Sequence, residues 1–203
     1  MGERRGNTDM NRAVFLDRDG VLNKPVVRSG KPYPPRTLAE FQLYPEAAEA
    51  CALLRDAGFQ LVVVTNQPDV GRGTQSLREI EAMHERLRQS IPLDRIEICT
   101  AADESAPDAR RRKPSPGMVL DAAAALRIDP ARSYLVGDRW RDIDCGHAAG
   151  CTTIFIERHY VEKLNLPPHH YVADLLAAAK LILSLEHLAP GPSTGQHASS
   201  PRL

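Results

Sequence analysis

Short apolar runs alternate with helical patterns along most of this chain, and that alternation restricts the fold more than any other feature of the sequence. Five runs predict β-strands, at residues 13–16, 60–64, 95–99, 133–136 and 151–156. Helices are predicted at residues 45–57, 76–89, 116–126, 142–149 and 172–185. Strands that are apolar on both faces and separated by helices are typical of a parallel sheet with helices on both sides. We therefore predict an α/β fold of this kind.

The size and charge of the chain indicate one globular domain. It has 203 residues, of which 42% are hydrophobic and 26% charged. Lys plus Arg equals Asp plus Glu, with 26 of each, so we expect neither nucleic acid nor a membrane surface as a partner. We predict a domain at residues 12–187, a flexible leader at 1–11 and a disordered tail at 188–203, because both ends are polar or rich in Pro, Gly and Ser.

The sequence shows no signal for export or membrane insertion. No apolar stretch is long enough to cross a bilayer, and the first twelve residues, MGERRGNTDMNR, lack the apolar segment of a signal peptide. The four cysteines, Cys51, Cys99, Cys145 and Cys151, form no CxxC pair. We therefore expect reduced, structural thiols and a cytoplasmic protein.

The stretch AVFLDRDGVLN, residues 13–23, reads as a buried strand that ends in two carboxylates. Asp17 and Asp19 stand one residue apart, and Gly20 frees the backbone to turn. Two like charges this close repel each other unless a cation lies between them, and Mg²⁺ is the default ion for such an oxygen site. A single DxDG is equally compatible with a solvated acidic turn.

Polar side chains also follow two other predicted strands. Thr65, Asn66 and Gln67 follow QLVVV, and each can donate to an anionic oxygen. Asp138 and Asp142 lie in GDRWRDID, directly after the fourth strand. Taken singly, a TNQ sequence is more often a turn, and an acid such as Asp142 often complements a helix dipole.

Lys113 lies in RRRKPSPG, where two prolines fix the backbone at a helix entry. A lysine in that place is commonly a solvated charge. Because ligands of parallel α/β folds bind beyond the carboxyl ends of the strands, we expect the acids, Thr65 and Lys113 to meet there. Together they supply a metal site and a phosphate cradle. The sequence has no P-loop, GxGxxG or GxSxG motif to favour another chemistry.

Four segments, DRDGVLN, VVVTNQ, RKPSPGM and VGDRWRDI, resemble in sequence and in order the four motifs of the haloacid dehalogenase (HAD) superfamily. In detail they are similar to its histidinol-phosphatase and D-glycero-D-manno-heptose 1,7-bisphosphate 7-phosphatase subfamily. The resemblance covers residues 12–156 and implies a Rossmann-like three-layer α/β/α core. Too few residues separate the motifs to build a large cap, so we expect a minimal cap or none.

The resemblance also implies roles for single residues. Asp17 would be the nucleophile that forms an aspartyl phosphate, and Asp19 would be the general acid and then the base. Mg²⁺ would be held by the Asp17 carboxylate, the Asp19 backbone carbonyl and the Asp138 carboxylate, with Asp142 supporting the site. Thr65 and Asn66 would hold phosphoryl oxygens, while Lys113 would neutralise charge on the phosphate and the nucleophile.

The chain departs from this subfamily in one loop. Members commonly carry a structural zinc held by Cys and His just before the RKP sequence. Here Cys99 is present, but Ala101 and Asp103 stand where a His would fall, and Ala109 and Arg111 stand in place of the later cysteines. One sulfur ligand cannot make a tetrahedral zinc site, so we expect no zinc.

Two features are candidates for substrate specificity. Arg112 is either a ligand for a distal anionic group or a solvent-facing charge. The proline-rich segment from Lys24 to Phe41 is either a small flap, with Arg28, Lys31 and Tyr33 as contacts, or an inert surface connection.

We therefore predict a monomeric, Mg²⁺-dependent phosphomonoesterase that acts on a small sugar phosphate, with a heptose bisphosphate as the leading substrate. Histidinol phosphate is the alternative within this class. A non-catalytic binding module and a phosphotransferase with another acceptor are alternatives from other classes.

Overall fold

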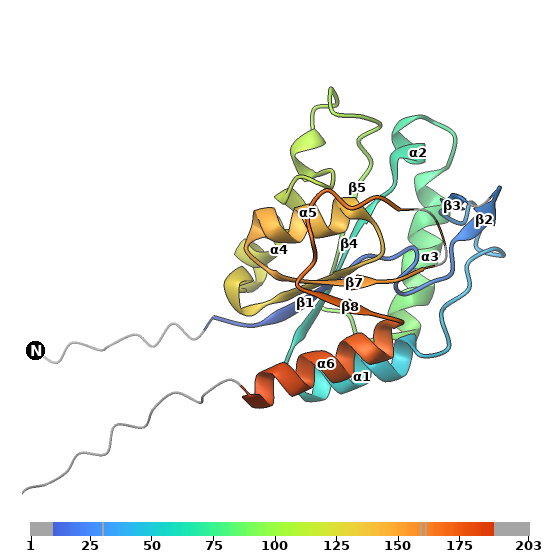
Figure 1. Ribbon diagram of the computed structural model, residues 1–203. Coiled ribbons are helices and arrows are strands. Elements are labelled where there is room, and N and C mark those ends of the chain that lie inside the picture. Colours follow the sequence, from blue (N-terminus) through green and yellow to red (C-terminus); the bar gives the residue numbers. More distant parts are fainter. Residues whose placement is uncertain (1–9, 30, 159, 161, 189–203) are drawn as a thin grey trace, which may run out of the picture.

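The computed structural model describes residues 10–29, 31–158, 160 and 162–188 (Figure 1). Most of the predicted leader and tail lies outside these residues. The centre is a six-stranded sheet in the order β5-β4-β1-β6-β7-β8, and all neighbouring strands pair in parallel. The strands are β1 Ala13–Leu16, β4 Gln60–Asn66, β5 Arg95–Cys99, β6 Tyr134–Gly137, β7 Thr152–Ile156 and β8 His170–Val172. The predicted parallel α/β fold is confirmed.

Strand β1 lies in the middle of the sheet, and its register decides what meets at the carboxyl edge. Leu16, its last residue, pairs with Val63 of β4 and with Val136 of β6. The residues that follow these three positions therefore lie near one another at the carboxyl edge, although β4 stays paired with β5 through Asn66. This brings the segments after β1, β4 and β6 together.

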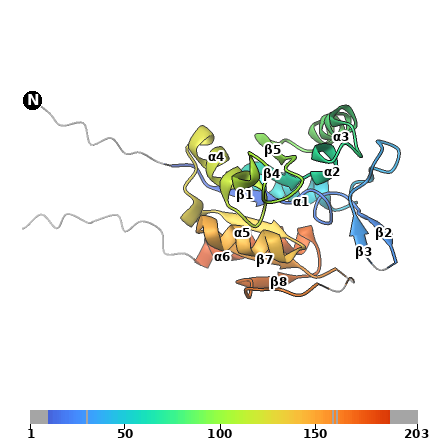
Figure 2. The ribbon, with the colours of Figure 1, turned by 90° about the horizontal axis from the view of Figure 1, so that it is seen from above.

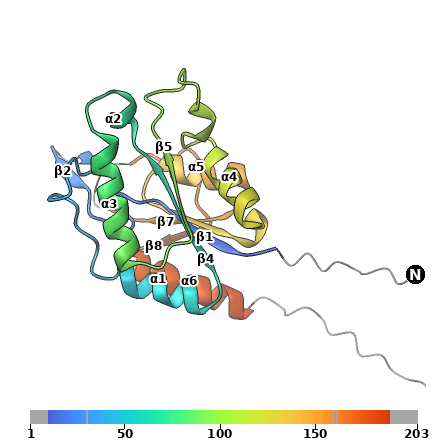
Figure 3. The ribbon, with the colours of Figure 1, turned by 180° about the vertical axis from the view of Figure 1, so that it is seen from behind.

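Helices cover both faces of the sheet, because alternate strand residues point to opposite sides. Val14 and Leu16 pack toward α1 Ala47–Asp56, α3 Leu77–Ser90 and α6 Leu175–Leu188. Ala13 and Phe15 pack toward α4 Gly117–Leu126 and α5 Trp140–Ala149. Figure 3, the view from behind, shows α1 and α6 side by side at the lower edge and α4 and α5 together on the other side.

The segment between β1 and α1 forms a small hairpin instead of a cap domain. Strands β2 Val26–Arg28 and β3 Lys31–Tyr33 pair antiparallel, and the hairpin projects from one end of the molecule (Figure 2). The prolines had indicated extended backbone here, and the structure agrees. No larger insertion exists among the described residues.

Two local predictions need correction. The helix predicted from Val172 begins at Leu175, because residues 170–172 form β8 and Asp174 accepts a hydrogen bond from the backbone N–H of Ala177 at 2.7 Å. The S-x-x-E spacing of Ser76 and Glu79 predicts a capping box at the start of α3, but only half of it forms. Ser76 accepts from the backbone of Glu79 at 3.2 Å, whereas the Glu79 carboxylate accepts from the backbone of Leu38 at 3.1 Å.

Short elements complete the chain. A one-turn helix, α2 Pro68–Gly71, follows β4, and 3₁₀ turns span Ala109–Arg111 and Pro130–Arg132. The four cysteines are buried and free, as expected. Within the described ranges, none of the helices has the length and apolar character needed to span a bilayer.

Candidate active site

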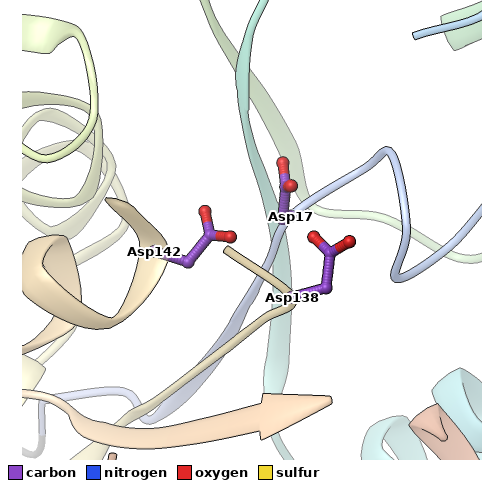
Figure 4. Close-up of side chains that lie close together, drawn as sticks. All are labelled: Asp17, Asp138 and Asp142. Carbon is purple, nitrogen blue, oxygen red and sulfur yellow. The ribbon is translucent and has the colours of Figure 1, made fainter. Parts of the chain in front are cut away.

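Three carboxylates from separate parts of the chain meet at the carboxyl edge of the sheet. Asp17 directly follows β1, Asp138 directly follows β6, and Asp142 lies in the first turn of α5. Figure 4 shows the three side chains turned toward one shared space. One oxygen from each lies within 4.8 Å of the others, and all three residues are buried.

The backbone around this trio is packed so closely that only glycine fits. Gly20 has φ +99°, and a Cβ there would lie 2.0 Å from Oδ2 of Asp138. A Cβ on Gly137 would lie 2.1 Å from the Cβ of Asp142. The DxDG and VGD sequences therefore place glycine where two loops approach the acids.

Lys113 is buried against the trio. Its Nζ atom lies 2.8 Å from Oδ1 of Asp17, 2.6 Å from Oδ1 of Asp142 and 2.8 Å from the carbonyl oxygen of Val64. Asn66 holds the backbone of Lys113 on both sides, because its Oδ1 accepts from the Lys113 N–H and its Nδ2 donates to the Lys113 carbonyl, both at 3.0 Å. The lysine predicted as a solvated charge or a site residue is thus fixed beside the acids.

Burial and mutual repulsion disturb the ionisation of this cluster. Burial raises the pKa of Asp17 to about 7, although Lys113 opposes the shift, and Asp142 adds to it. Burial, with Asp17 and Asp142 nearby, also raises the pKa of Asp138 well above its usual value. For Lys113, burial opposes the charged form, but Asp142 and Asp17 outweigh it and raise the pKa.

The donor set fits a divalent cation. Oδ1 of Asp138 is among the buried oxygens that accept no hydrogen bond within the described part of the chain. The trio is also the only group of three or more His, Cys, Asp or Glu ligands close enough to share an ion among the described residues. Carboxylate oxygens are the ligands that Mg²⁺ prefers.

Asp142 has a second role in the local structure. Its Oδ2 accepts a hydrogen bond from the backbone N–H of Arg139 at 3.0 Å, which caps α5. The sequence left open whether this acid caps the helix or serves the site. The structure shows that one oxygen caps α5 while the other contacts Lys113.

The other predicted residues lie close by. Asp19 lines the same cavity as Asp17, and its carboxylate accepts hydrogen bonds from Arg18, Asn23 and Gln67. Thr65 is buried at the end of β4, and its hydroxyl accepts a hydrogen bond from Nε2 of Gln67 at 2.9 Å.

The acids form the floor of a cavity of about 330 Å³. The β2–β3 hairpin contributes one wall, and arginines contribute another. The hairpin wall consists of Pro25, Pro32, Tyr33 and Pro34, and the arginines are Arg36, Arg72, Arg112, Arg139 and Arg141. A second cavity, of about 850 Å³, shares Arg72, Arg112, Lys113 and Arg141 with the first and extends along residues 102–115.

These arginines differ in their partners. Arg139 pairs with Glu162 at 2.9 Å, and Arg72 pairs with Asp69 at 3.2 Å. Arg112 donates to the carbonyl of Ala101 at 2.8 Å, and the Arg141 guanidinium lies 4.5 Å from the ring centroid of Trp140. Burial and the charges of Arg139 and Arg112 lower the pKa of Arg141.

Several contacts have no local signal in the sequence. The hydroxyl of Tyr160 donates to Oδ2 of Asp138, and Nε of Arg158 donates to the Gly20 carbonyl at 2.8 Å. Both side chains follow β7 and only tertiary folding brings them here. Of the three proposed flap contacts, Tyr33 lines the cavity, whereas Arg28 and Lys31 are exposed on the hairpin.

The loop that carries zinc in the resembling subfamily is held here by hydrogen bonds and ion pairs. Arg111 pairs with Glu97 and, at 3.0 Å, with Asp121. The Cys99 thiol lies 3.9 Å from the carbonyl oxygen of Asp108. These contacts span the stretch where the sequence lacks zinc ligands, and absence of zinc stays a prediction.

Comparisons with known proteins identify the family. A HAD-hydrolase-like family profile matches residues 110–179. D-glycero-D-manno-heptose-1,7-bisphosphate 7-phosphatase of Chlorobaculum tepidum is 34% identical over 187 residues, which cover 82% of this chain and 92% of that protein. The enzyme of the same name from Thermosynechococcus vestitus is 34% identical over 201 residues, covering 88% and 97%.

Solved structures agree with the sequence matches. The crystal structure of D,D-heptose 1,7-bisphosphate phosphatase from B. bronchiseptica, in complex with magnesium and phosphate, has a TM-score of 0.73 at 28% identity and covers 86% of this chain and 99% of its own. The enzyme from Burkholderia thailandensis has a TM-score of 0.59 at 27% identity, with coverage of 86% and 99%. Fold, site and sequence together place the chain in the D-glycero-D-manno-heptose-1,7-bisphosphate 7-phosphatase family of HAD-like hydrolases.

Proposed function

We propose that the protein is a Mg²⁺-dependent phosphatase that removes the 7-phosphate of D-glycero-D-manno-heptose 1,7-bisphosphate. The observation that carries this proposal is the buried contact of Asp17 with Lys113 at the carboxyl edge of the sheet, beside Asp138 and Asp142. The named activity of the relatives supports the choice of substrate.

The reaction begins at Asp17. One of its carboxylate oxygens attacks phosphorus, the bond from phosphorus to the sugar oxygen breaks, and Asp19 donates a proton to that departing oxygen. Water then attacks the aspartyl phosphate, and Asp19 accepts the proton of this water. The bond between phosphorus and Asp17 breaks, and inorganic phosphate leaves.

Positive charge beside Asp17 makes this attack possible, because an anionic nucleophile must approach an anionic phosphate. Lys113 supplies one such charge at 2.8 Å, and Asn66 fixes its backbone. The Thr65 hydroxyl accepts a hydrogen bond from Gln67 at 2.9 Å, and it would donate its own proton to a phosphoryl oxygen at the same edge.

The carboxylates of Asp17 and Asp138 and the backbone carbonyl of Asp19 would hold Mg²⁺, and Asp142 would support the site. When bound, the ion supplies positive charge that offsets the repulsion among the acids and the phosphate. The protein's part is to keep three buried carboxylates within 4.8 Å of one another.

The arginine wall supports a substrate with a second anionic group. Arg112 and Arg141 pair with no carboxylate among the described residues, and both border the first and second cavities. Guanidinium groups bind phosphate with several donors at once. A substrate whose reacting phosphate lies at Asp17 would therefore place its other phosphate near Arg112 and Arg141.

The test compares substrates by ³¹P NMR with full-length protein and Mg²⁺. We expect the heptose bisphosphate to lose its 7-phosphate and keep its 1-phosphate, with a higher kcat/KM than hexose monophosphates or histidinol phosphate. A higher kcat/KM for histidinol phosphate would replace the heptose assignment. Release from none of these substrates would favour a binding module that keeps the fold without catalysis.

A further inference from the structure

We propose that Arg18 is a positioning residue that orients the Asp19 carboxyl group for the water step, with His84 of α3 holding the other end of the Arg18 guanidinium. The inference rests on the proposed function and gives a positioning role to Arg18, the residue between the two acids. Arg18 is fully buried, an unusual place for a charged side chain. The catalytic steps described above make no use of it.

The guanidinium of Arg18 donates hydrogen bonds to both oxygens of the Asp19 carboxyl group. Nη2 donates to Oδ2 at 2.9 Å and to Oδ1 at 3.1 Å, while Nε donates to Oδ1 at 3.2 Å. Such a fork fixes both the position and the orientation of a carboxyl group. A lysine, with one nitrogen and a flexible stem, cannot reproduce it.

Two more side chains complete the arrangement. Asn23 donates to Oδ1 at 2.9 Å, and Gln67 donates to Oδ2 at 2.8 Å. All of these contacts are donated toward Asp19, so they fix the position of both of its carboxyl oxygens. The same Gln67 amide donates to the Thr65 hydroxyl, which links the orientation of Asp19 to the phosphate end of β4.

His84 contacts Nη1 of Arg18, on the side of the guanidinium away from Asp19. Its Nε2 lies 3.3 Å from Nη1 of Arg18, and both residues are buried. The Phe41 ring centroid lies 5.8 Å from the guanidinium carbon of Arg18. Burial and the neighbouring Arg18 charge lower the pKa of His84 to about 4. The ring is therefore neutral at neutral pH and accepts the Arg18 proton at Nε2.

The contacts on Asp19 matter most in the second step of the reaction, when water attacks the aspartyl phosphate. Asp19 gives up its proton in the first step, so it meets the attacking water as a carboxylate whose two oxygens these donors hold in place. In that step the water oxygen bonds to phosphorus, its proton moves to Asp19, and the bond from phosphorus to Asp17 breaks. Loosening Asp19 should therefore slow loss of the aspartyl phosphate more than its formation.

The test is Arg18→Lys in the full-length protein, with p-nitrophenyl phosphate and the sugar bisphosphate as substrates. We expect kcat to fall by about 10- to 100-fold, within the usual contribution of a general base. KM should fall by the same factor, leaving kcat/KM nearly unchanged, because only the second step slows. Acid quenching should then trap phosphorylated protein that the wild type does not accumulate.

Control variants separate this role from stability. Arg111→Lys changes an ion-paired arginine whose side chain lines neither cavity, unlike its neighbours Arg110 and Arg112, and it should leave the kinetic constants unchanged. If Arg18→Lys does not fold, His84 supplies a second pair. His84→Leu removes the acceptor and should lower kcat and KM together, whereas His84→Gln keeps an acceptor and should resemble the wild type.

Equal losses of kcat and kcat/KM, with unchanged KM and no phosphorylated protein, would overturn the inference while leaving the proposed function intact. A wild type that releases phosphate from no substrate would instead refute the proposed function itself.

Discussion

At the scale of single residues, the site depends on how closely the backbone approaches the carboxylates. Gly20 combines a left-handed φ of +99° with a Cβ position only 2.0 Å from Asp138. Gly58, at the end of α1, has a similar φ of +84° but no atom within 4 Å of its Cβ position. A substitution at Gly58 therefore tests backbone strain alone, whereas a substitution at Gly20 also disturbs the acid cluster.

We predict that Gly20→Ala abolishes phosphatase activity, because the new methyl group displaces the Asp138 carboxylate. Gly58→Ala should cost about 1 kcal/mol in the free energy of unfolding, from strain alone, and keep full activity. Thermal melts and steady-state kinetics on both variants check this. An active Gly20→Ala protein would show that the approach to Asp138 is not needed.

At the scale of elements, ion pairs hold the loop that follows β5. Glu97 is buried on β5 and pairs with Arg95 and Arg111, and Arg111 reaches Asp121 on α4. These pairs tie the sheet, the loop and α4 together. They hold in place the segment in which the resembling subfamily carries zinc.

We predict that Arg111→Met lowers the free energy of unfolding by about 1–3 kcal/mol, because it leaves a buried carboxylate with fewer donors. The neighbouring Arg110→Met should cost less than Arg111→Met, since Arg110 is 68% exposed where it pairs with Asp121. Denaturant unfolding of the two variants measures this difference in the free energy of unfolding.

Metal analysis of the same preparations should find no stoichiometric zinc, and stoichiometric zinc would refute the zinc-free prediction.

Elements also show why sequence reasoning succeeded in some places and failed in others. The strands 13–16 and 95–99 were predicted to the residue, since buried parallel strands form continuous apolar runs. Strand β8 was missed because three residues are too few to show a period. Asp174, the cap of α6, was the available signal for where that helix begins.

The acid cluster was predictable because each member follows a strand that ends at the same edge. The contacts of Tyr160 with Asp138 and of Arg158 with Gly20 were not, because they join segments 22 and 138 residues apart. The fork of Arg18 on Asp19 was also missed, since strand alternation places neighbouring side chains on opposite sides and only the turn at Gly20 brings them together.

At the scale of the whole molecule, buried carboxylates couple folding to pH. The pKa of Asp17 rises from 3.8 to about 7 on burial. A carboxyl with a raised pKa favours folding in its protonated form, so this contribution is full below pH 3.8 and is lost as the pH rises through about 7. His84, whose pKa is lowered to about 4, acts in the opposite direction below pH 6.5.

We therefore predict that Asp17→Asn becomes more stable relative to the wild type as the pH rises from about 5 to about 8 without metal, because asparagine cannot ionise. Comparing the two proteins cancels the His84 effect. Mg²⁺ should raise the melting temperature of the wild type more at pH 8 than at pH 5, since it binds ionised carboxylates. A pH-independent difference between the melting temperatures would contradict the raised pKa of Asp17.

The central claim is that Asp17 is the nucleophile of a Mg²⁺-dependent heptose bisphosphate phosphatase. The most direct test measures phosphate release from D-glycero-D-manno-heptose 1,7-bisphosphate by wild type and Asp17→Asn side by side. We expect the wild type to release one phosphate per substrate and the variant to react more slowly by on the order of 10³-fold or more. Equal release by both proteins would contradict it.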